Sequence, residues 1–100
     1  MPRLLTSREV EKRLEGLEGW ETAGRFISKT FEFKTFLKGI DFVDVIARVA
    51  ESQEHHPDIH IRYTKVKLSI QTHSEGGVTE WDFALAKAIE KTISTPRRGH

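Results

Sequence analysis

Hydrophobic residues recur at helical spacing in three stretches of the sequence. In the first stretch, Thr6 and Glu9 have the spacing of a capping box at a helix N-terminus. A helix is therefore predicted over about residues 7–15. The last stretch opens at Thr79, with Asp82 three residues later at the same capping spacing. Its predicted core stripe consists of Leu85, Ala86, Ile89 and Ile93.

The middle stretch, residues 36–53, is the most informative of the three predicted helices. Its apolar residues form two adjacent stripes, which are Phe36, Ile40, Val43, Ala47 and Ala50, and Phe42, Val45, Ile46 and Val49. Together they cover a wider arc than the ~100° that a surface helix needs. A sheet can bury one stripe. We expect the other to contact the same helix of a second subunit, and burial by the first or last helix of its own chain is the alternative.

Alternating apolar and polar residues predict strands between these helices. A short strand after Trp20, a turn at Ala23-Gly24 and a strand over residues 25–33 suggest a hairpin. Two further strands are predicted over 59–63 and 66–72. The order α-β-β-α-β-β-α predicts an α+β fold, a four-stranded antiparallel sheet with three helices packed on one face.

Composition limits the classes of protein to consider. One hundred residues suit a single domain, 1–100. The net charge of +1 argues against a nucleic-acid partner, and no apolar run approaches the ~18 residues of a membrane span. There is no cysteine, which excludes disulfides and thiolate chemistry. We expect a cytoplasmic protein, since the first residues lack the apolar core of a signal peptide.

Three of the five histidines occupy loop-like positions and are the candidates for chemistry. They are His55, His56 and His73, and we expect them to meet at one small-molecule pocket. Histidine exchanges protons near neutral pH. The nearby carboxylates that could orient these rings are Glu51, Glu54 and Asp82.

Each of these residues also has a purely structural interpretation. The pair at 55–56 is compatible with a loop that ends a helix, because Pro57 disfavours helical geometry at the residue before it. Asp82 suits a helix cap, Tyr63 suits packing, and Trp20 suits the core or a pocket wall. His60 and His100 are interpreted as solvated.

A metal site is the competing chemistry. Three histidines with nearby carboxylates could hold a divalent ion. However, adjacent residues in an extended segment point apart, so His55 and His56 are poorly placed to chelate one ion. The sequence also lacks the His-Glu-x-x-His pattern, a phosphate-binding loop and a dinucleotide fingerprint. No metal is therefore expected.

At this point the sequence resembles a known family, the pterin-4a-carbinolamine dehydratases. The matching residues, at the family's spacing, are Glu51, His55-His56-Pro57, Tyr63, His73 and Asp82. Gly19-Trp20 and Thr72-His73 extend the match, which covers nearly the whole chain.

The resemblance implies dehydration of 4a-hydroxytetrahydropterin to quinonoid dihydropterin, which recycles the cofactor of aromatic amino acid hydroxylases without metal or organic cofactor. By position, His55 and His73 correspond to an acid/base pair that helps the hydroxyl leave as water, and His56 corresponds to a residue that binds and orients. Glu54 stands where the family often has aspartate. The resemblance places the substrate contacts at Trp20, Glu51, Glu54, Pro57, Thr72 and Asp82.

A binding module is the alternative from a different class. Relatives of this fold act as dimerisation partners or cofactors of other proteins, including a transcription factor in animals. Retention of all three histidines favours the enzyme, because a protein that only bound partners would not need them. A third, weaker possibility is action on a different pterin, as in molybdopterin metabolism. The expected partners are a pterin substrate and further copies of the chain, in a homodimer or homotetramer assembled through residues 36–53 and the sheet edges.

Overall fold

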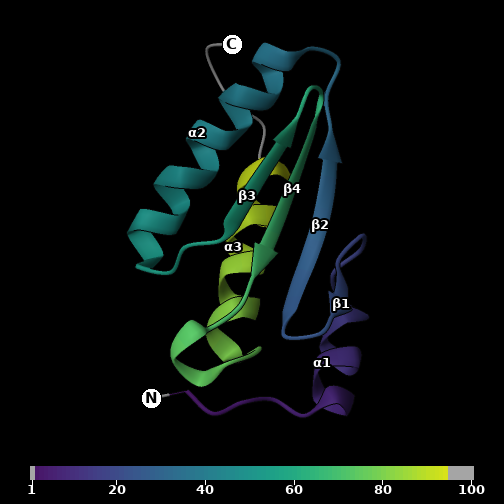
Figure 1. Cartoon of the computed structure of the whole chain (residues 1–100), viewed down its shortest axis with the longest axis vertical. Helices are drawn as coiled ribbons and strands as arrows, with labels where there is room; N and C mark the ends of the chain where they lie inside the picture. Colours follow the sequence, from purple (N-terminus) through teal and green to yellow (C-terminus); the bar gives the residue numbers. More distant parts are fainter. Residues whose placement is uncertain (1, 95–100) are drawn as a thin grey trace.

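The chain forms three α-helices, four strands and one short 3-10 helix, seen in a computed structural model that describes residues 2–94 (Figure 1). In order they are α1 (Ser7–Leu14), β1 (Glu21–Ala23), β2 (Phe26–Glu32), α2 (Phe36–Gln53), β3 (Asp58–Arg62), β4 (Lys65–Ile70), η1 (His73–Glu75) and α3 (Glu80–Ser94). The predicted α+β fold is confirmed, and η1 is an addition to the predicted order. Pro96 and the tail 97–100, expected beyond the last helix, lie outside the described residues.

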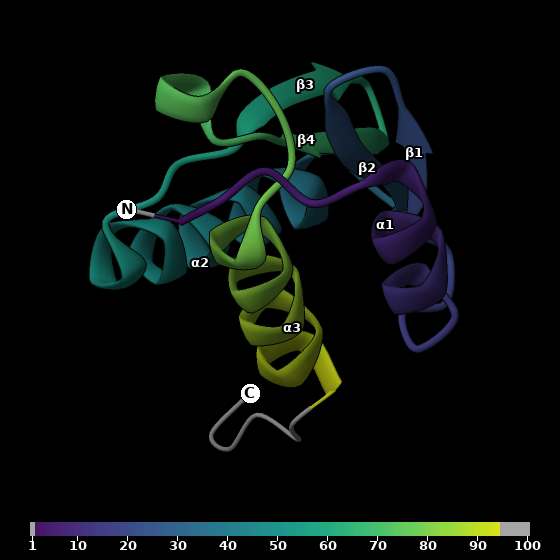
Figure 2. The same ribbon diagram turned by 90° about the horizontal axis from the view of Figure 1, so that it is seen from below.

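The four strands form one antiparallel sheet in the order β1-β2-β4-β3. Its inner positions face the helices, and Ile27, Val66 and Leu68 there are completely buried. The helices α1, α2 and α3 all lie on this face, as the view from below shows (Figure 2). The alternation of apolar and polar residues along β4 thus fixes which face is covered.

The ends of the β3 and β4 strands differ from the predicted ones. Tyr63 was expected to end a strand, but it lies with Thr64 in a two-residue connection, at a positive φ of 54°. The following strand was expected to continue to Thr72, but it ends at Ile70. Thr72 instead forms an isolated bridge with Gly77, which closes a small loop around η1. The segment between β4 and α3 therefore contains a hydrogen-bonded turn.

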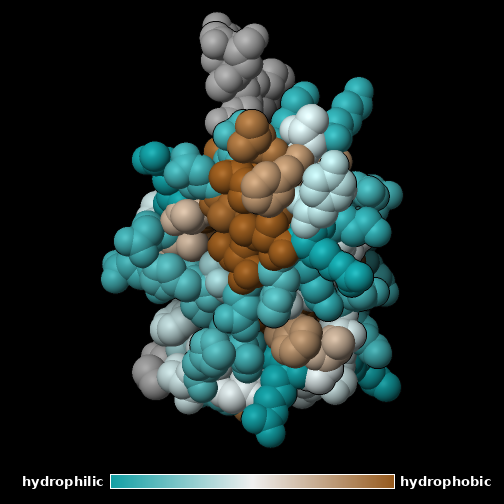
Figure 3. Space-filling model, turned by 45° about the horizontal axis from the view of Figure 1, so that its top comes forward, coloured by the Kyte–Doolittle hydropathy of each residue, from teal (hydrophilic) through white to brown (hydrophobic). Residues whose placement is uncertain are grey.

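The two stripes of α2 differ in burial. Phe42 and Ile46 are buried, and at Gly39 an added Cβ would lie 3.5 Å from Val66. Phe36 and Ala47 of the other stripe are exposed, Ile40 and Val43 are half-buried, and Ala50 is buried. This stripe is therefore only partly covered by its own chain. Apolar surface gathers into one patch on the face shown in Figure 3. The exposed large apolar side chains on α2 and β3 are Phe36, Leu37 and Ile61.

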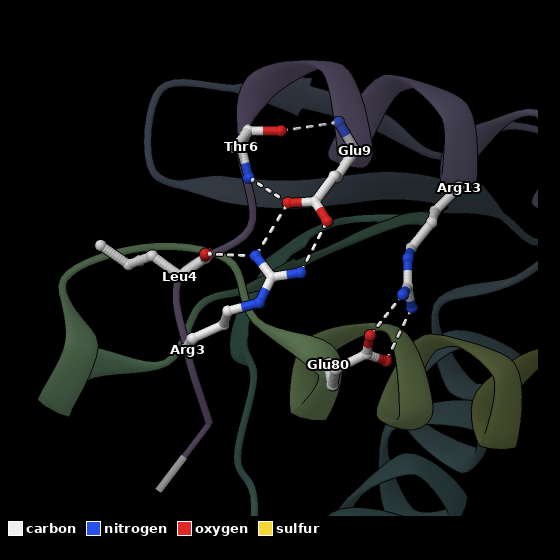
Figure 4. Close-up of polar contacts among 6 residues, drawn as sticks. All are labelled: Arg3, Leu4, Thr6, Glu9, Arg13 and Glu80. Carbon is white, nitrogen blue, oxygen red and sulfur yellow. Dashed lines mark hydrogen bonds and ion pairs between the residues drawn. The ribbon is translucent and has the colours of Figure 1, made fainter.

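The helix α1 begins with the predicted capping box. Thr6 Oγ1 accepts from Glu9 N–H at 3.1 Å, and Glu9 Oε1 accepts from Thr6 N–H at 2.8 Å. Arg3 bonds both carboxylate oxygens of Glu9, and Arg13 does the same to Glu80 on α3 (Figure 4). Both pairs lie at the surface, where water competes for the charged groups, so neither pair is a main source of stability.

The segment before α1 lies against the loop between η1 and α3. Leu5 N–H donates to the Val78 carbonyl at 2.9 Å. A Cβ added at Gly77 would come within 2.9 Å of Leu4, so glycine permits this close approach. Along residues 2–94, no helix combines the length and the apolar character needed to cross a membrane.

Candidate active site

The end of α2 sets the direction of the two adjacent histidines. Glu54 adopts the left-handed conformation, with φ 53°, and its N–H bonds the carbonyls of Ala50 and Glu51. This closes the helix in the manner of a helix C-cap, although glycine is the usual residue there. The chain then leaves the helix before Pro57, as predicted. His55 and His56 consequently extend from a non-helical segment and bond different carboxylates.

Asp82 is the centre of a buried hydrogen-bond network at the head of α3. One oxygen, Oδ1, lies 2.6 Å from His55 Nε2. The other, Oδ2, accepts from Thr79 N–H at 2.7 Å and from the Thr72 hydroxyl at 2.9 Å. The Asp82 side chain is 0% exposed. Asp82 therefore serves both interpretations at once, as the cap of α3 and as the orienting partner of His55.

The Asp82 carboxylate determines which groups in the network donate and which accept. Because an ionised carboxylate only accepts hydrogen bonds, Nε2 of His55 carries a proton. The Thr72 hydroxyl donates to Asp82, so it must accept from the Thr79 hydroxyl at 2.7 Å. In a neutral His55 ring, Nδ1 is then the free acceptor. Asp82 thus fixes both the tautomer and the orientation of this ring.

The contact between His56 and Glu51 resembles that between His55 and Asp82 in geometry, but it is exposed to solvent. His56 Nε2 lies 2.5 Å from Glu51 Oε2, and these side chains are 61% and 76% exposed. Water competes for both groups at such exposure, so this bond holds the ring far less firmly than Asp82 holds His55.

His73 reaches the same region from the other side. It begins η1, which the Thr72–Gly77 bridge closes and which Gly76 terminates at φ 74°. Its side chain borders an open hollow of 220 Å³, and so do the other two histidines. The complete lining is Glu54, His55, His56, Gln71, Thr72, His73, Ser74 and Trp81. The structure therefore brings the three predicted histidines to one hollow from separate parts of the sequence.

Several predicted substrate contacts do not line this hollow. Trp20 is 5% exposed, packs edge-on against Phe31 and donates its indole N–H to Glu90 at 2.8 Å. Trp20 is therefore a core residue, which was its structural interpretation from the sequence. Asp82 bonds His55 and Glu51 bonds His56, but neither carboxylate lines the hollow, and Pro57 does not line it either.

Three lining residues were not among the predicted site residues, namely Gln71, Ser74 and Trp81. Trp81 is the largest of them. It is 48% exposed and lies beside His55, with ring centroids 6.2 Å apart. A signal was available, because Trp81 directly precedes the predicted cap Asp82 in the first turn of α3. Within residues 2–94, no group of three or more His, Cys, Asp or Glu side chains is arranged to hold a metal ion.

The α+β fold with three imidazoles around one polar hollow defines a class of small proteins with potential acid–base chemistry. Comparison with known families identifies the class more closely. The family model described as pterin 4 alpha carbinolamine dehydratase matches residues 3–92. The chain belongs to this family.

Relatives and a solved structure agree with this assignment. A protein of Sulfolobus acidocaldarius is 46% identical over 87% of this chain and 96% of its own length. One of Roseiflexus castenholzii is 47% identical over 93% of this chain and 100% of its own. Both names carry the designation pterin-4-alpha-carbinolamine dehydratase. The crystal structure titled transcriptional coactivator/pterin dehydratase from Brucella melitensis has a TM-score of 0.83 at 36% identity, covering 89% of this chain and 97% of that one.

A more distant structure shows the fold alone. It has a TM-score of 0.60 at 20% identity and covers 77% of this chain and 89% of that one. Its title describes a pterin dehydratase-like protein as a RuBisCO assembly factor in the alpha-carboxysome. The same fold thus occurs in a protein whose title names assembly rather than catalysis, and fold by itself does not decide function.

Proposed function

We propose that this protein is a 4a-hydroxytetrahydrobiopterin dehydratase, which converts the 4a-carbinolamine to quinonoid dihydropterin by histidine acid–base catalysis. The observation that carries the proposal is the hollow bordered by His55, His56 and His73, with Asp82 fixing the tautomer of the first. Family membership supplies the reaction class.

The reaction needs one acid and one base. The C4a–O bond breaks as the hydroxyl takes a proton and leaves as water. The electron pair of N5 forms the C4a–N5 double bond, and N5 loses its proton to a base. Positioned groups of this kind contribute about 10²–10⁴-fold in rate.

The contacts suggest how the roles are divided. Since Nε2 of His55 donates to Asp82, its Nδ1 is available to accept the N5 proton. The buried carboxylate then stabilises the imidazolium that forms. The exposed ring of His73 is assigned the acid that protonates the hydroxyl, and His56 and Glu54 are assigned substrate orientation at the same hollow.

The test measures dehydration of freshly generated 4a-hydroxytetrahydropterin, corrected for its spontaneous rate. His73→Ala and His55→Gln should each lower kcat by about 100-fold or more. Glutamine retains an N–H donor for Asp82, so the fold should survive, as thermal melts would check. The matched control is His60→Ala, because His60 lies on the opposite, open face of the sheet. Wild-type turnover in both variants would defeat the proposal, and loss of activity with a chelator would support the metal alternative.

We also propose that the exposed stripe of α2 contacts the same helix of a second copy. Phe36 and Ala47 are exposed there, although α2 is otherwise packed on the sheet. Burying such apolar surface is the main favourable term in association. Light scattering should give a multiple of the 11.5 kDa chain mass. Ala47→Glu should reduce the mass to one chain, whereas Asp41→Lys, on the polar face, should not. A wild-type monomer would refute this contact.

A protein-binding module remains the second candidate function. The same apolar stripe of α2 favours it, because a different protein could cover that surface. Turnover separates the two functions. A wild-type protein without activity that still assembles through α2 would favour the binding module.

A further inference from the structure

Trp81 is an unusual residue for its position. Large aromatic side chains are normally buried to a large extent. The other tryptophan, Trp20, follows this rule at 5% exposed, but Trp81 remains 48% exposed. It stands at the rim of a polar hollow, where a bare indole has no evident role in folding.

The backbone beneath Trp81 is firmly held. Its N–H donates to the Thr79 hydroxyl at 3.2 Å. The Thr79 hydroxyl bonds the Thr72 hydroxyl, which donates to Asp82, and Asp82 bonds His55. The Trp81 backbone and the His55 ring are therefore held by one hydrogen-bond network, and the indole and imidazole planes lie at 70° to each other. Such pre-organisation lowers the entropy cost of binding a ligand against these two rings.

Trp81 is also shared between two hollows. The histidine-lined hollow of 220 Å³ is smaller than the ~300–1,000 Å³ typical of small-molecule sites. A second hollow of 310 Å³ borders the same Glu54, His55 and Trp81, and is completed by Gln53 and Ala84. His55 and Trp81 thus border two hollows, and the larger of them is within the size range of a small-molecule site.

We propose that Trp81 is a substrate-binding residue whose indole packs against the pyrimidine part of the pterin and holds it against His55. This inference rests on the proposed function, because it takes the pterin as the ligand. Packing a flat conjugated surface against an aromatic face is favourable, and in this substrate the conjugated N1–C2–N3–C4 part of the pyrimidine ring provides that surface. The proton transfers themselves are left to the histidines.

Intrinsic fluorescence provides a direct test, because the chain contains only two tryptophans. The probe is an oxidised, fully planar pterin, with free N-acetyltryptophanamide to correct for absorbed light. Trp20→Phe leaves Trp81 as the only emitter, and its emission should be quenched saturably. Trp81→Phe leaves only Trp20, and saturable quenching should disappear. Should Trp20→Phe melt early, wild type against Trp81→Phe gives the same comparison.

Kinetics supplies the second measurement. Trp81→Leu should raise KM about 10-fold, with kcat within about three-fold of wild type and an unchanged pH profile, and Trp81→Phe should restore most of the loss. Glu80→Gln, on the same turn of α3, is the matched control. A wild-type KM in Trp81→Leu, in a protein that turns over, would overturn the inference. Saturable quenching of Trp81 without any turnover would instead contradict the proposed function and leave the binding role intact.

Discussion

Two carboxylates in the first turn of α3 have opposite environments. Asp82 is completely buried and bonds His55, Thr72 and Thr79. Glu80, two residues earlier, is 54% exposed and bonds Arg13 on α1 (Figure 4). Each makes short contacts with a group that can be a cation, yet water is excluded from one and surrounds the other.

Burial, and not contact distance, therefore decides how much such a pair affects stability and how firmly it holds a side chain. At the surface, solvent replaces a lost partner, so an ion pair has little effect on stability. In the interior, a lost partner leaves donors without any acceptor. A buried network therefore holds the His55 ring in place, while the surface pairs on α1 and α3 connect elements that the core already packs together.

The largest effect should come from removing the buried carboxylate. Asp82→Ala leaves three donors unpaired and should cost about 3–5 kcal/mol of the free energy of unfolding. Asp82→Asn keeps the shape and should lose less stability, about 1–2 kcal/mol. Its amide N–H faces Nε2 of His55, which favours the wrong tautomer, so turnover should fall by about 100-fold or more. Denaturant melts beside turnover measure both effects. An active Asp82→Asn would contradict the role assigned to Asp82, and Glu80→Gln is the control.

A smaller effect is expected at the exposed histidine pair. Glu51→Gln should change the free energy of unfolding by less than about 0.5 kcal/mol, because both groups are mostly solvated. Its effect on turnover should stay within about five-fold and appear mainly in KM, since His56 keeps its place on the hollow. Asp44→Asn on the same helix controls for the change in charge. An effect as large as that of Asp82→Asn would mean that Glu51 becomes buried when substrate binds or subunits assemble.

The smallest effect should come from the capping box of α1, and it should depend on pH. The hydrogen bond from Arg3, aided by Thr6 N–H, lowers the pKa of Glu9 to about 2 from its ordinary 4.5. A lowered folded-state pKa means that this contribution is complete above pH 4.5 and is lost as pH falls toward 2. The difference in melting temperature between wild type and Glu9→Gln should therefore shrink over that range. Melts from pH 7 to 2 would show this, and a constant difference would contradict it.

The sequence was sufficient for features that depend on local spacing. Apolar periodicity gave the range of α2 to the residue, and the capping box at Thr6 was found as predicted. The ends of β3 and β4 were less predictable. Tyrosine is common in strands, but Tyr63 lies in the connection to β4 and has a positive φ. The geometry of the tight connection between β3 and β4 thus outweighed the preference of tyrosine for a strand.

The order of the elements, the apolar faces of the helices and the set of three histidines could be read from the chain, because periodicity, capping and family spacing are properties of residues taken in order. The packed fold was needed to see that Asp82 lies against His55, 27 residues away, that Trp20 turns into the core and that Trp81 faces the hollow. Which way a side chain faces depends on how separate helices and strands pack against one another, and no local pattern contains that information.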